Sequence, residues 1–352
     1  MFSLIRPLLF KIDPETAHNL AIKSLKFNYI PENFFQVENE GMLKINLFGK
    51  TFLNPIGLAA GFDKSAEVYN SIFKLGFGFV EIGTVTPQSQ YGNPKPRIFR
   101  LEKDEALINR LGFNNEGSKI IHERILSNPP KGILGVNIGP NKETKNQEND
   151  FLECLKIFFN IADYITINIS SPNTEKLRTF HESEKLTSLL KLINLEKSNH
   201  KSQISIMLKI SPDIDEISIE KISDIALQNF VSALIISNTS IVNRENLNDP
   251  LKNETGGLSG KPIEKVSNNL IKKFYKTLKG RIPIIGVGGV NSAESAYEKI
   301  SSGASLIQLY TGFIYKGPYI VKNIKKGLIK KLKINGIKNI SQIIGKNSSS
   351  NI

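Results

Sequence analysis

The sequence predicts an α/β protein built as a (β/α)8 TIM barrel, and three observations lead to this prediction. Eight short apolar segments, rich in β-branched residues, follow one another between residues 55 and 310. Stretches with the spacing of an amphipathic helix separate most of them, and polar or glycine residues gather where each segment ends. Near-continuous apolar strands with helical crossovers are typical of a parallel sheet covered by helices. A doubly wound sheet is the alternative, but no G-x-G-x-x-G fingerprint opens a helix after a predicted strand.

The predicted elements alternate along the chain. The strands are Pro55–Ala60, Phe79–Thr84, Ile133–Ile138, Tyr164–Ile169, Ile204–Ile210, Ala233–Ser237, Ile282–Val287 and Ser305–Tyr310. The helices are Ala66–Leu75, Glu116–Leu126, Asp150–Ile161, Lys185–Leu195, Ile217–Gln228, Glu264–Leu278 and Ala293–Ser301. The catalytic barrel is therefore expected to span residues 41–320, which matches the ~250 residues of a typical barrel plus inserts.

Residues 1–40 are expected to form a separate N-terminal helical segment. Asp13, Pro14 and Glu15 are typical of a helix start, because they supply an N-cap carboxylate, a first-turn proline and an acid near the helix N-terminus. The helix that follows places small and apolar residues on one face, namely Ala17, Leu20, Ala21, Ser24 and Leu25. Such a face either packs on the barrel or lies on a membrane surface. The sequence pattern leaves both interpretations open.

Inserts and a tail complete the chain. Alternation around Gly49 and Lys50 predicts a β-hairpin over residues 43–52 that plugs the barrel before its first strand. A second β-hairpin is predicted between residues 97–101 and 106–108, and another long connection covers residues 239–259. Long inserts after barrel strands usually cover an active site. Residues 321–352 are expected to form a basic C-terminal helix and a frayed or disordered tail, beginning near Gly345.

Composition excludes several classes of protein. The single cysteine, Cys154, excludes a disulfide framework, falls in a predicted helix and is expected to serve packing. The four histidines have no ligand spacing, so no metal site is expected. The net charge of +13 suits solvated helix faces, an anionic substrate or an anionic membrane surface. No nucleic-acid-binding module is present, and no apolar run approaches the ~20 residues that span a bilayer.

The ends of the predicted strands carry amide and lysine side chains rather than acid pairs. The candidates are Asn109, Asn137, Asn168, Asn173, Asn238, Lys64 and Lys209. In a (β/α)8 barrel the active site lies at these ends. Carboxamides both donate and accept hydrogen bonds, so they suit a planar ligand edged with N–H and C=O groups. Lys64 suits an anion, and the absence of a carboxylate pair disfavours glycoside hydrolysis.

Glycines follow the last two strands. Gly288 and Gly289 come after the seventh strand and Gly312 after the eighth, each ahead of a helix N-terminus. This arrangement is the usual phosphate cradle of the fold, although Gly288 and Gly289 could also form a plain tight turn. Lys209 lies inside an apolar strand, so a Schiff-base lysine of the aldolase type is a rival interpretation.

Ordered motifs make the chain similar to a known family. They are Gly57–Lys64, Glu81–Pro87, Asn109–Asn115, Asn168–Thr174, Gly256–Gly260, Ile284–Gly289 and Gly303–Ser305. Together they resemble the quinone-dependent (class 2) branch of the dihydroorotate dehydrogenase family, from the N-terminal segment to about residue 320. The resemblance implies an FMN-dependent oxidoreductase that oxidises (S)-dihydroorotate to orotate in de novo pyrimidine (UMP) biosynthesis and passes electrons to a membrane quinone.

The resemblance also implies roles for individual residues. Ser171, in place of the Cys of soluble class 1 members, is the base that removes the C5 proton, and Thr174 and Phe113 flank a water path for that proton. The implied substrate-binding residues are Lys64, Asn109, Arg110, Leu111, Gly112, Phe113, Asn168, Asn173, Asn238 and Thr239. The implied FMN-binding residues are Ala60, Gly61, Phe62, Asp63, Lys64, Thr84, Asn137, Asn168, Lys209, Ser237, Gly260, Gly289, Tyr310 and Thr311. A cation at Lys209 would stabilise the anionic reduced flavin.

By the same resemblance, residues 1–40 form the quinone entrance of a monomer bound peripherally to the cytoplasmic side of the cell membrane. The chain departs from the family pattern at Ser237, at Gln88 and Ser89, and at Pro140. None of these departures touches the implied reacting groups. Three other functions stay open: a soluble FMN barrel oxidoreductase of the dihydroorotate or dihydropyrimidine type, a Lys209 Schiff-base lyase, and a membrane-surface barrel without a cofactor.

Overall fold

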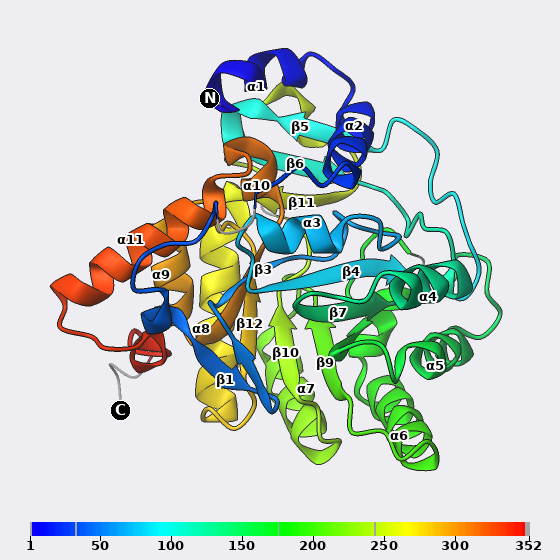
Figure 1. The fold of residues 1–352 in the computed structure, drawn as a ribbon. Coiled ribbons are helices and arrows are strands. Elements are labelled where there is room, and N and C mark those ends of the chain that lie inside the picture. The colour runs from blue at the N-terminus through cyan, green and yellow to red at the C-terminus, as the bar shows by residue number, and fades with distance from the viewer. Residues whose placement is uncertain (1, 32–33, 175, 243, 349–352) are drawn as a thin grey trace.

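Eight parallel strands close into a barrel, and the last strand pairs with the first (Figure 1). The computed structural model describes residues 2–31, 34–174, 176–242 and 244–348. The barrel strands are β3 (Ile56–Leu58), β4 (Phe79–Val85), β7 (Ile133–Ile138), β8 (Tyr164–Asn168), β9 (Ser205–Ile210), β10 (Ala233–Ile236), β12 (Ile284–Val287) and β13 (Ala304–Leu309). The predicted (β/α)8 barrel is thus confirmed, with each strand within a few residues of its predicted range.

Helices cover the outside of the barrel. They are α3 (Tyr69–Lys74), α4 (Ser118–Ser127), α5 (Gln147–Phe158), α6 (Ser183–Asn199), α7 (Glu216–Gln228), α8 (Glu264–Leu278), α9 (Ala293–Ser301) and α11 (Ile320–Ile334). The ranges of α8 and α9 agree with the prediction. Helix α3 starts three residues later than predicted, because Ala66 takes a left-handed φ of 55° that a helix cannot contain. Cys154 is fully buried in α5, as predicted.

Aromatic rings fill the bottom of the barrel. The rings of Phe52 and Phe79 meet edge to face with centroids 5.4 Å apart, and Tyr164 continues the stack. Phe52 ends the hairpin of β1 (Ile45–Leu47) and β2 (Lys50–Phe52), so this hairpin plugs the barrel as predicted. A Cβ at Gly135 would overlap the ring of Tyr164, so only glycine leaves room for that ring.

A small antiparallel sheet stands beside the open end of the barrel. It joins the predicted hairpin, β5 (Ile98–Leu101) and β6 (Ala106–Asn109), to a third strand, β11 (Gly257–Gly260). The third strand comes from the long connection after β10, and no local pattern in the sequence indicated it. Because β11 pairs with β6 across about 150 residues of chain, the two long inserts form one unit over the cavity.

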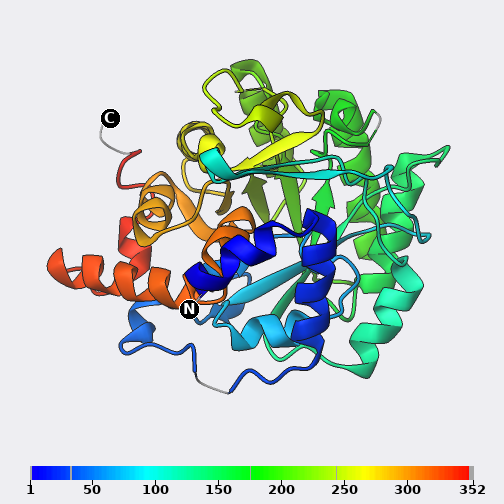
Figure 2. The same ribbon diagram turned by 90° about the horizontal axis from the view of Figure 1, so that it is seen from above.

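The N-terminal helices α1 (Phe2–Phe10) and α2 (Pro14–Lys26) lie over the barrel end next to this sheet (Figures 1 and 2). Asp13 caps α2 as predicted, its carboxylate accepting a hydrogen bond from the Thr16 amide at 2.8 Å. The buried side chain of α2 is Ile22, whereas Leu20 on the predicted apolar face is half exposed. Leu25 of the same predicted face packs against the core, so that face is divided between the barrel and solvent. Across the described residues, none of the helices has both the length and the apolar character needed to cross a membrane.

The C-terminal region differs in part from the prediction. Helix α11 begins at Ile320 as expected, after a short helix α10 (Thr311–Lys316). Residues 345–348 were expected to be frayed, but Ser348 is buried and its hydroxyl donates to the Ser302 carbonyl at 2.8 Å. The expectation of a frayed tail is therefore wrong for residues 345–348, because they pack on the end of α9. Residues 349–352 lie outside the described part of the chain.

Candidate active site

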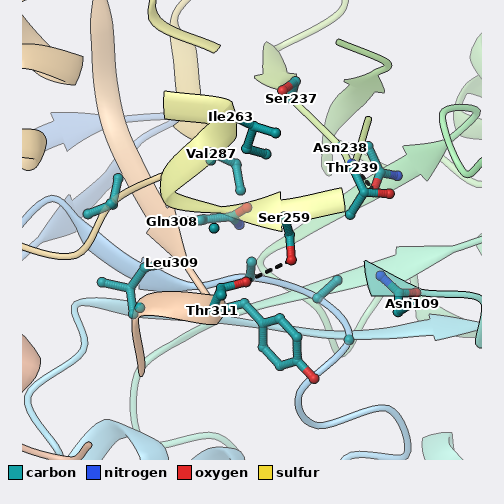
Figure 3. Close-up of a pocket in the computed structure, with 18 of the residues that line it drawn as sticks. Asn109, Ser237, Asn238, Thr239, Ser259, Ile263, Val287, Gln308, Leu309 and Thr311 are labelled. Atoms are coloured by element: carbon teal, nitrogen blue, oxygen red, sulfur yellow. Dashed lines mark hydrogen bonds between the residues drawn. The ribbon is translucent and has the colours of Figure 1, made fainter. Parts of the chain in front are cut away.

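A deep cavity opens at the C-terminal ends of the barrel strands (Figure 3). Its space, including the part of the mouth that is open to solvent, is about 1180 Å³. Most sequence-predicted site residues line it: Lys64, Asn109, Leu111, Gly112, Phe113, Asn168, Ser171, Asn173, Asn238, Thr239, Ala60, Gly61, Thr84, Lys209, Ser237, Gly260, Gly289, Tyr310 and Thr311.

Two of the predicted residues that do not line the cavity use their side chains elsewhere. The Asp63 carboxylate accepts hydrogen bonds from the backbone amides of Glu67 and Val68 at 2.7 and 2.8 Å, and so shapes the loop before α3. The Arg110 guanidinium pairs with Glu254 at 2.8 Å. Asp63 thus orders the loop after β3, and Arg110 ties the β6 end to the insert after β10.

Phe62 and Thr174 also lie outside the lining. Phe62 is buried and packs edge to face on Tyr310 and Phe313. Thr174 is buried three residues after Ser171, and the hydroxyl of Ser171 lies closer to the cavity. Phe62 and Thr174 therefore lie behind groups that face the cavity.

Asn137 lies one layer below the cavity and orients the residues above it. Its side-chain oxygen accepts from the Thr84 hydroxyl at 2.6 Å and from the Asn168 amide at 3.1 Å. The Asn238 amide in turn donates to the Asn168 oxygen at 3.3 Å and to the Ser170 hydroxyl at 2.8 Å. Asn137, Asn168 and Asn238 thus form one hydrogen-bonded network, in which neighbours set the amide orientations, while the Asn173 side chain donates separately to the Asn109 carbonyl at 3.1 Å.

The floor of this network is a carboxylate that the sequence patterns did not single out. Glu81 is fully buried in β4. It accepts hydrogen bonds from the Asn137 amide at 2.8 Å, the Tyr164 hydroxyl at 3.1 Å and the Gln308 amide at 2.8 Å. Burial, together with the neighbouring Glu81, raises the pKa of the Tyr164 hydroxyl well above its usual value. The sequence feature that could have indicated this role of Glu81 is the presence of an acidic residue inside an otherwise apolar strand.

Lys209 reaches the cavity from β9 without a protein partner. Within the described ranges, its ammonium group makes no hydrogen bond or ion pair. Burial lowers the pKa of Lys209, and the negative charge of Glu81 opposes that shift. Two further buried atoms on the cavity wall have no hydrogen-bond partner, the Ser237 hydroxyl and the Gln308 side-chain oxygen. A buried polar group without a partner is costly, so these three groups indicate that a polar ligand belongs here.

Glycines shape the other end of the cavity. Gly288 and Gly289 adopt φ values of 113° and 78°, which favour glycine. A Cβ at Gly289 would overlap Glu264 at the start of α8. The Thr311 hydroxyl lies beside this turn and shares a 2.8 Å hydrogen bond with Ser259 of β11 (Figure 3). Backbone amides and hydroxyls gathered in this way can bind a phosphate.

Lys64 and Ser171 face the space between these two ends. Burial lowers the pKa of Lys64 to about 8, against the opposing effect of Glu15. The Ser171 hydroxyl is buried and accepts a hydrogen bond from the backbone N–H of Asn173 at 3.2 Å. No histidine or carboxylate of the described residues contacts that hydroxyl. In the same part of the chain, no group of three or more His, Cys, Asp or Glu side chains is placed to hold a metal ion.

Comparison with known proteins then identifies the family. A family model described as dihydroorotate dehydrogenase matches residues 42–332. The chain belongs to the dihydroorotate dehydrogenase family. A relative in Idiomarina loihiensis, named dihydroorotate dehydrogenase (quinone), is 43% identical over 331 residues, covering 92% of this chain and 99% of that protein. A relative in Rhizobium etli with the same name is 46% identical over 332 residues, covering 92% and 90%.

Solved structures agree with this assignment. A crystal structure of DHODH from Eimeria tenella in complex with ferulenol superposes with a TM-score of 0.91 at 38% identity, covering 96% of each chain. A crystal structure of ligand-free DHODH from Eimeria tenella gives a TM-score of 0.89 at 39% identity, covering 95% of this chain and 99% of that one. Membership of the family makes the chain an oxidoreductase. The Schiff-base lyase and the cofactor-free barrel are therefore set aside.

Proposed function

We propose that this protein oxidises (S)-dihydroorotate to orotate, with FMN as hydride acceptor and a quinone as final electron acceptor, in de novo pyrimidine biosynthesis. The observation that carries the proposal is the joint placement of Ser171, Lys209 and the carboxamide network in one cavity. The curated relatives at 43–46% identity carry the quinone-dependent name, which favours a quinone over the acceptors of a soluble oxidoreductase.

The residues present fit FMN. Bound flavin supplies a two-electron acceptor that a protein side chain cannot provide. Gly288, Gly289 and Thr311 would hold its phosphate, because they offer backbone amides and a hydroxyl in a turn too tight for a side chain. Lys209 would meet the ring system with a positive charge, and the unpartnered Ser237 hydroxyl would gain a hydrogen-bonding partner.

The remaining groups fit dihydroorotate. Lys64 would bind its carboxylate, and the side chains of Asn109, Asn173 and Asn238 would pair with the N–H and C=O groups of its ring. In this arrangement the Ser171 hydroxyl oxygen takes the C5 proton. A serine hydroxyl is a weak base, so the proton must pass on to water.

Ser171→Ala tests the role of the base. Reduction of the flavin by dihydroorotate, followed anaerobically by its absorbance, should slow at least ~10²–10⁴-fold, because general-base catalysis contributes about that much. Flavin content and orotate binding should not change, since Ser171 is one of many residues that line the cavity. Ser171→Cys is the matched control, because a thiol retains a proton acceptor and should keep measurable reduction. Near-normal reduction in Ser171→Ala would refute the role.

The electron acceptor is tested separately. Reduced protein should be reoxidised by a soluble quinone analogue, and fumarate or NAD should not replace it. Turnover with fumarate or NAD but not with quinone would place the protein among the soluble dihydroorotate oxidoreductases instead.

We also propose that α1 and α2 bind the surface of the cell membrane from its cytoplasmic side. Leu4 and Leu8 of α1 are 79% and 66% exposed, and Leu20 of α2 is half exposed. Large apolar side chains gathered on one exposed segment are typical of a membrane or protein contact. Arg6 and Lys11 add positive charge next to them, which favours an anionic lipid surface.

A further inference from the structure

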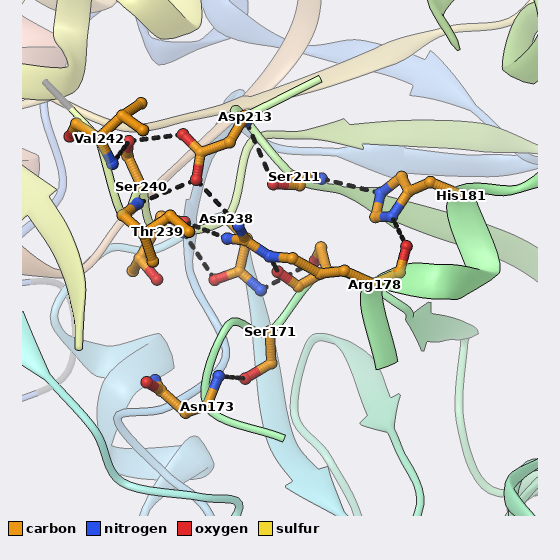
Figure 4. Close-up of polar contacts among 12 residues, drawn as sticks. Ser171, Asn173, Arg178, His181, Ser211, Asp213, Asn238, Thr239, Ser240 and Val242 are labelled. Carbon is orange, nitrogen blue, oxygen red and sulfur yellow. Dashed lines mark hydrogen bonds and ion pairs between the residues drawn. The ribbon is translucent and has the colours of Figure 1, made fainter. Parts of the chain in front are cut away.

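Arg178 lies outside the cavity and binds three separate segments of its rim (Figure 4). Its Nε donates to the Ser170 carbonyl at 3.1 Å. One terminal nitrogen pairs with the Asp213 carboxylate at 2.9 Å, and the other donates to the Thr239 carbonyl at 3.0 Å. The guanidinium therefore joins the loops that follow β8, β9 and β10.

Asp213, the carboxylate partner of Arg178, makes further hydrogen bonds with the loop after β10. Its side chain is only 9% exposed. Besides Arg178, it accepts hydrogen bonds from the Ser240 hydroxyl at 2.6 Å and from the Ile241 amide at 2.9 Å. A buried carboxylate with donors on both oxygens is held rigidly, and its charge is compensated by the guanidinium.

The backbone of Arg178 is held as well. The Nδ1 atom of His181 lies 2.9 Å from the Arg178 carbonyl, and the Ser211 amide donates to the His181 Nε2 at 3.3 Å. Because Nε2 accepts, the ring is neutral and Nδ1 carries the proton that it donates to the carbonyl. The whole turn from Arg178 to His181 is therefore fastened to the loop after β9.

Two of the segments that Arg178 joins carry the groups assigned to the reaction. Ser170 precedes Ser171, and Thr239 follows Asn238 in the cavity lining. The Asn238 amide also donates to the Ser170 hydroxyl at 2.8 Å, so the two segments already meet inside the cavity. Arg178 makes the matching connection on the outside of these loops.

We propose that the Arg178–Asp213 pair is a positioning clamp that holds the Ser171 hydroxyl at a fixed place relative to the Asn238–Thr239 edge of the substrate site. Arginine suits this task because its planar fork donates in three fixed directions at once, whereas the lysine ammonium donates from one point. The clamp acts on proton removal from the substrate, and it does not touch the quinone side of the reaction. The inference rests on the proposed function.

The two half-reactions, measured separately on the flavin-loaded protein, test the clamp. In Arg178→Ala, flavin reduction by dihydroorotate should slow about 10²-fold, because a misplacement of about 1 Å can cost that much. Arg178→Lys and Asp213→Asn, which preserve the size of the side chain, should give smaller losses in the same step. Reoxidation by a soluble quinone and the midpoint potential of the flavin should stay unchanged in all three variants.

Chemical rescue adds a readout that a general loss of structure would not give. Added guanidinium ion should restore part of the reduction rate of Arg178→Ala and should not accelerate the unaltered protein. Arg281→Ala is the control, since the Arg281 guanidinium also donates to a backbone carbonyl, that of Leu278, but at the end of α8 and away from the Ser171 loop. Neither half-reaction should change in Arg281→Ala.

Two outcomes would overturn the clamp. One is an unchanged reduction rate in Arg178→Ala, and the other is an equal loss in reduction and reoxidation, which would indicate a general structural effect. If dihydroorotate fails to reduce the flavin of the unaltered protein, the proposed function itself fails and the clamp with it. Normal reduction in the unaltered protein together with normal reduction in Arg178→Ala would refute the clamp alone.

Discussion

The buried carboxylate of Glu81 allows a stability prediction that can be worked out from the structure. Glu81→Gln keeps the size of the side chain and removes its charge. The amides of Asn137 and Gln308 and the hydroxyl of Tyr164 all donate to the carboxylate. A glutamine offers one oxygen and brings two N–H donors of its own, so at least one donor in this buried cluster loses its partner.

The magnitude follows from these three hydrogen bonds. A hydrogen bond to a charged group contributes ~1.5–3 kcal/mol and one between neutral groups ~0.5–1.5 kcal/mol. The substitution should therefore cost about 1 kcal/mol at each donor, or about 3 kcal/mol in all. For a chain of 352 residues, an unfolding entropy of ~2.1 cal/mol/K per residue gives ~0.7 kcal/mol/K, so Tm should fall by about 4 °C.

Thermal unfolding followed by circular dichroism measures this change. Glu216→Gln is the control, because Glu216 is exposed and its ion pair with Lys273 lies on the surface, where such pairs contribute little. Glu216→Gln should leave Tm unchanged. A Tm for Glu81→Gln equal to that of the unaltered protein would refute the inference that Glu81 stabilises the floor of the active site.

Three further predictions concern other parts of the protein. Burial holds the pKa of Lys64 at about 8. Orotate affinity, measured by flavin absorbance titration, should therefore be constant below about pH 8 and weaken up to tenfold per pH unit above it. The Lys64→Met variant should bind orotate weakly at every pH. Gly135→Ala should lower stability by ~1–3 kcal/mol or more through overpacking against the Tyr164 ring, as measured by denaturant unfolding. Leu8→Glu should reduce co-sedimentation with vesicles containing anionic lipid, because it places a negative charge on the exposed apolar face of α1.

Matched variants separate these effects from general damage. Gly41→Ala adds a methyl group where no atom lies within 4 Å, so it should leave unfolding unchanged. Leu195→Glu changes an exposed leucine of α6 and should leave vesicle binding unchanged. Orotate affinity that does not vary with pH, normal stability of Gly135→Ala, or undiminished vesicle binding of Leu8→Glu would each contradict the corresponding prediction.

The barrel and much of its site could be predicted from the sequence because both depend on local patterns. The period of apolar residues predicts strands and helices, and helices α8 and α9 were predicted with the bounds that they have in the structure. Strand ends of a parallel barrel meet on one side, so the sequence positions of Lys64, Asn168 and Lys209 predict that they surround one cavity, as they do. The ordered motifs led to the family, which the comparisons confirm.

Only the tertiary structure determines which residues far apart in the chain come into contact. The pairing of β11 with β6 depends on hydrogen bonds across about 150 residues, and neither segment indicates it alone. Ile22, not Leu20, faces the interior from α2, because Ile22 is the residue that meets the main hydrophobic core once the helix is docked. The partners of Glu81 and of Arg178 likewise come from strands and loops that only the closed barrel brings together. The local sequence sets which residues form each strand and loop, but barrel closure determines which of their polar groups meet.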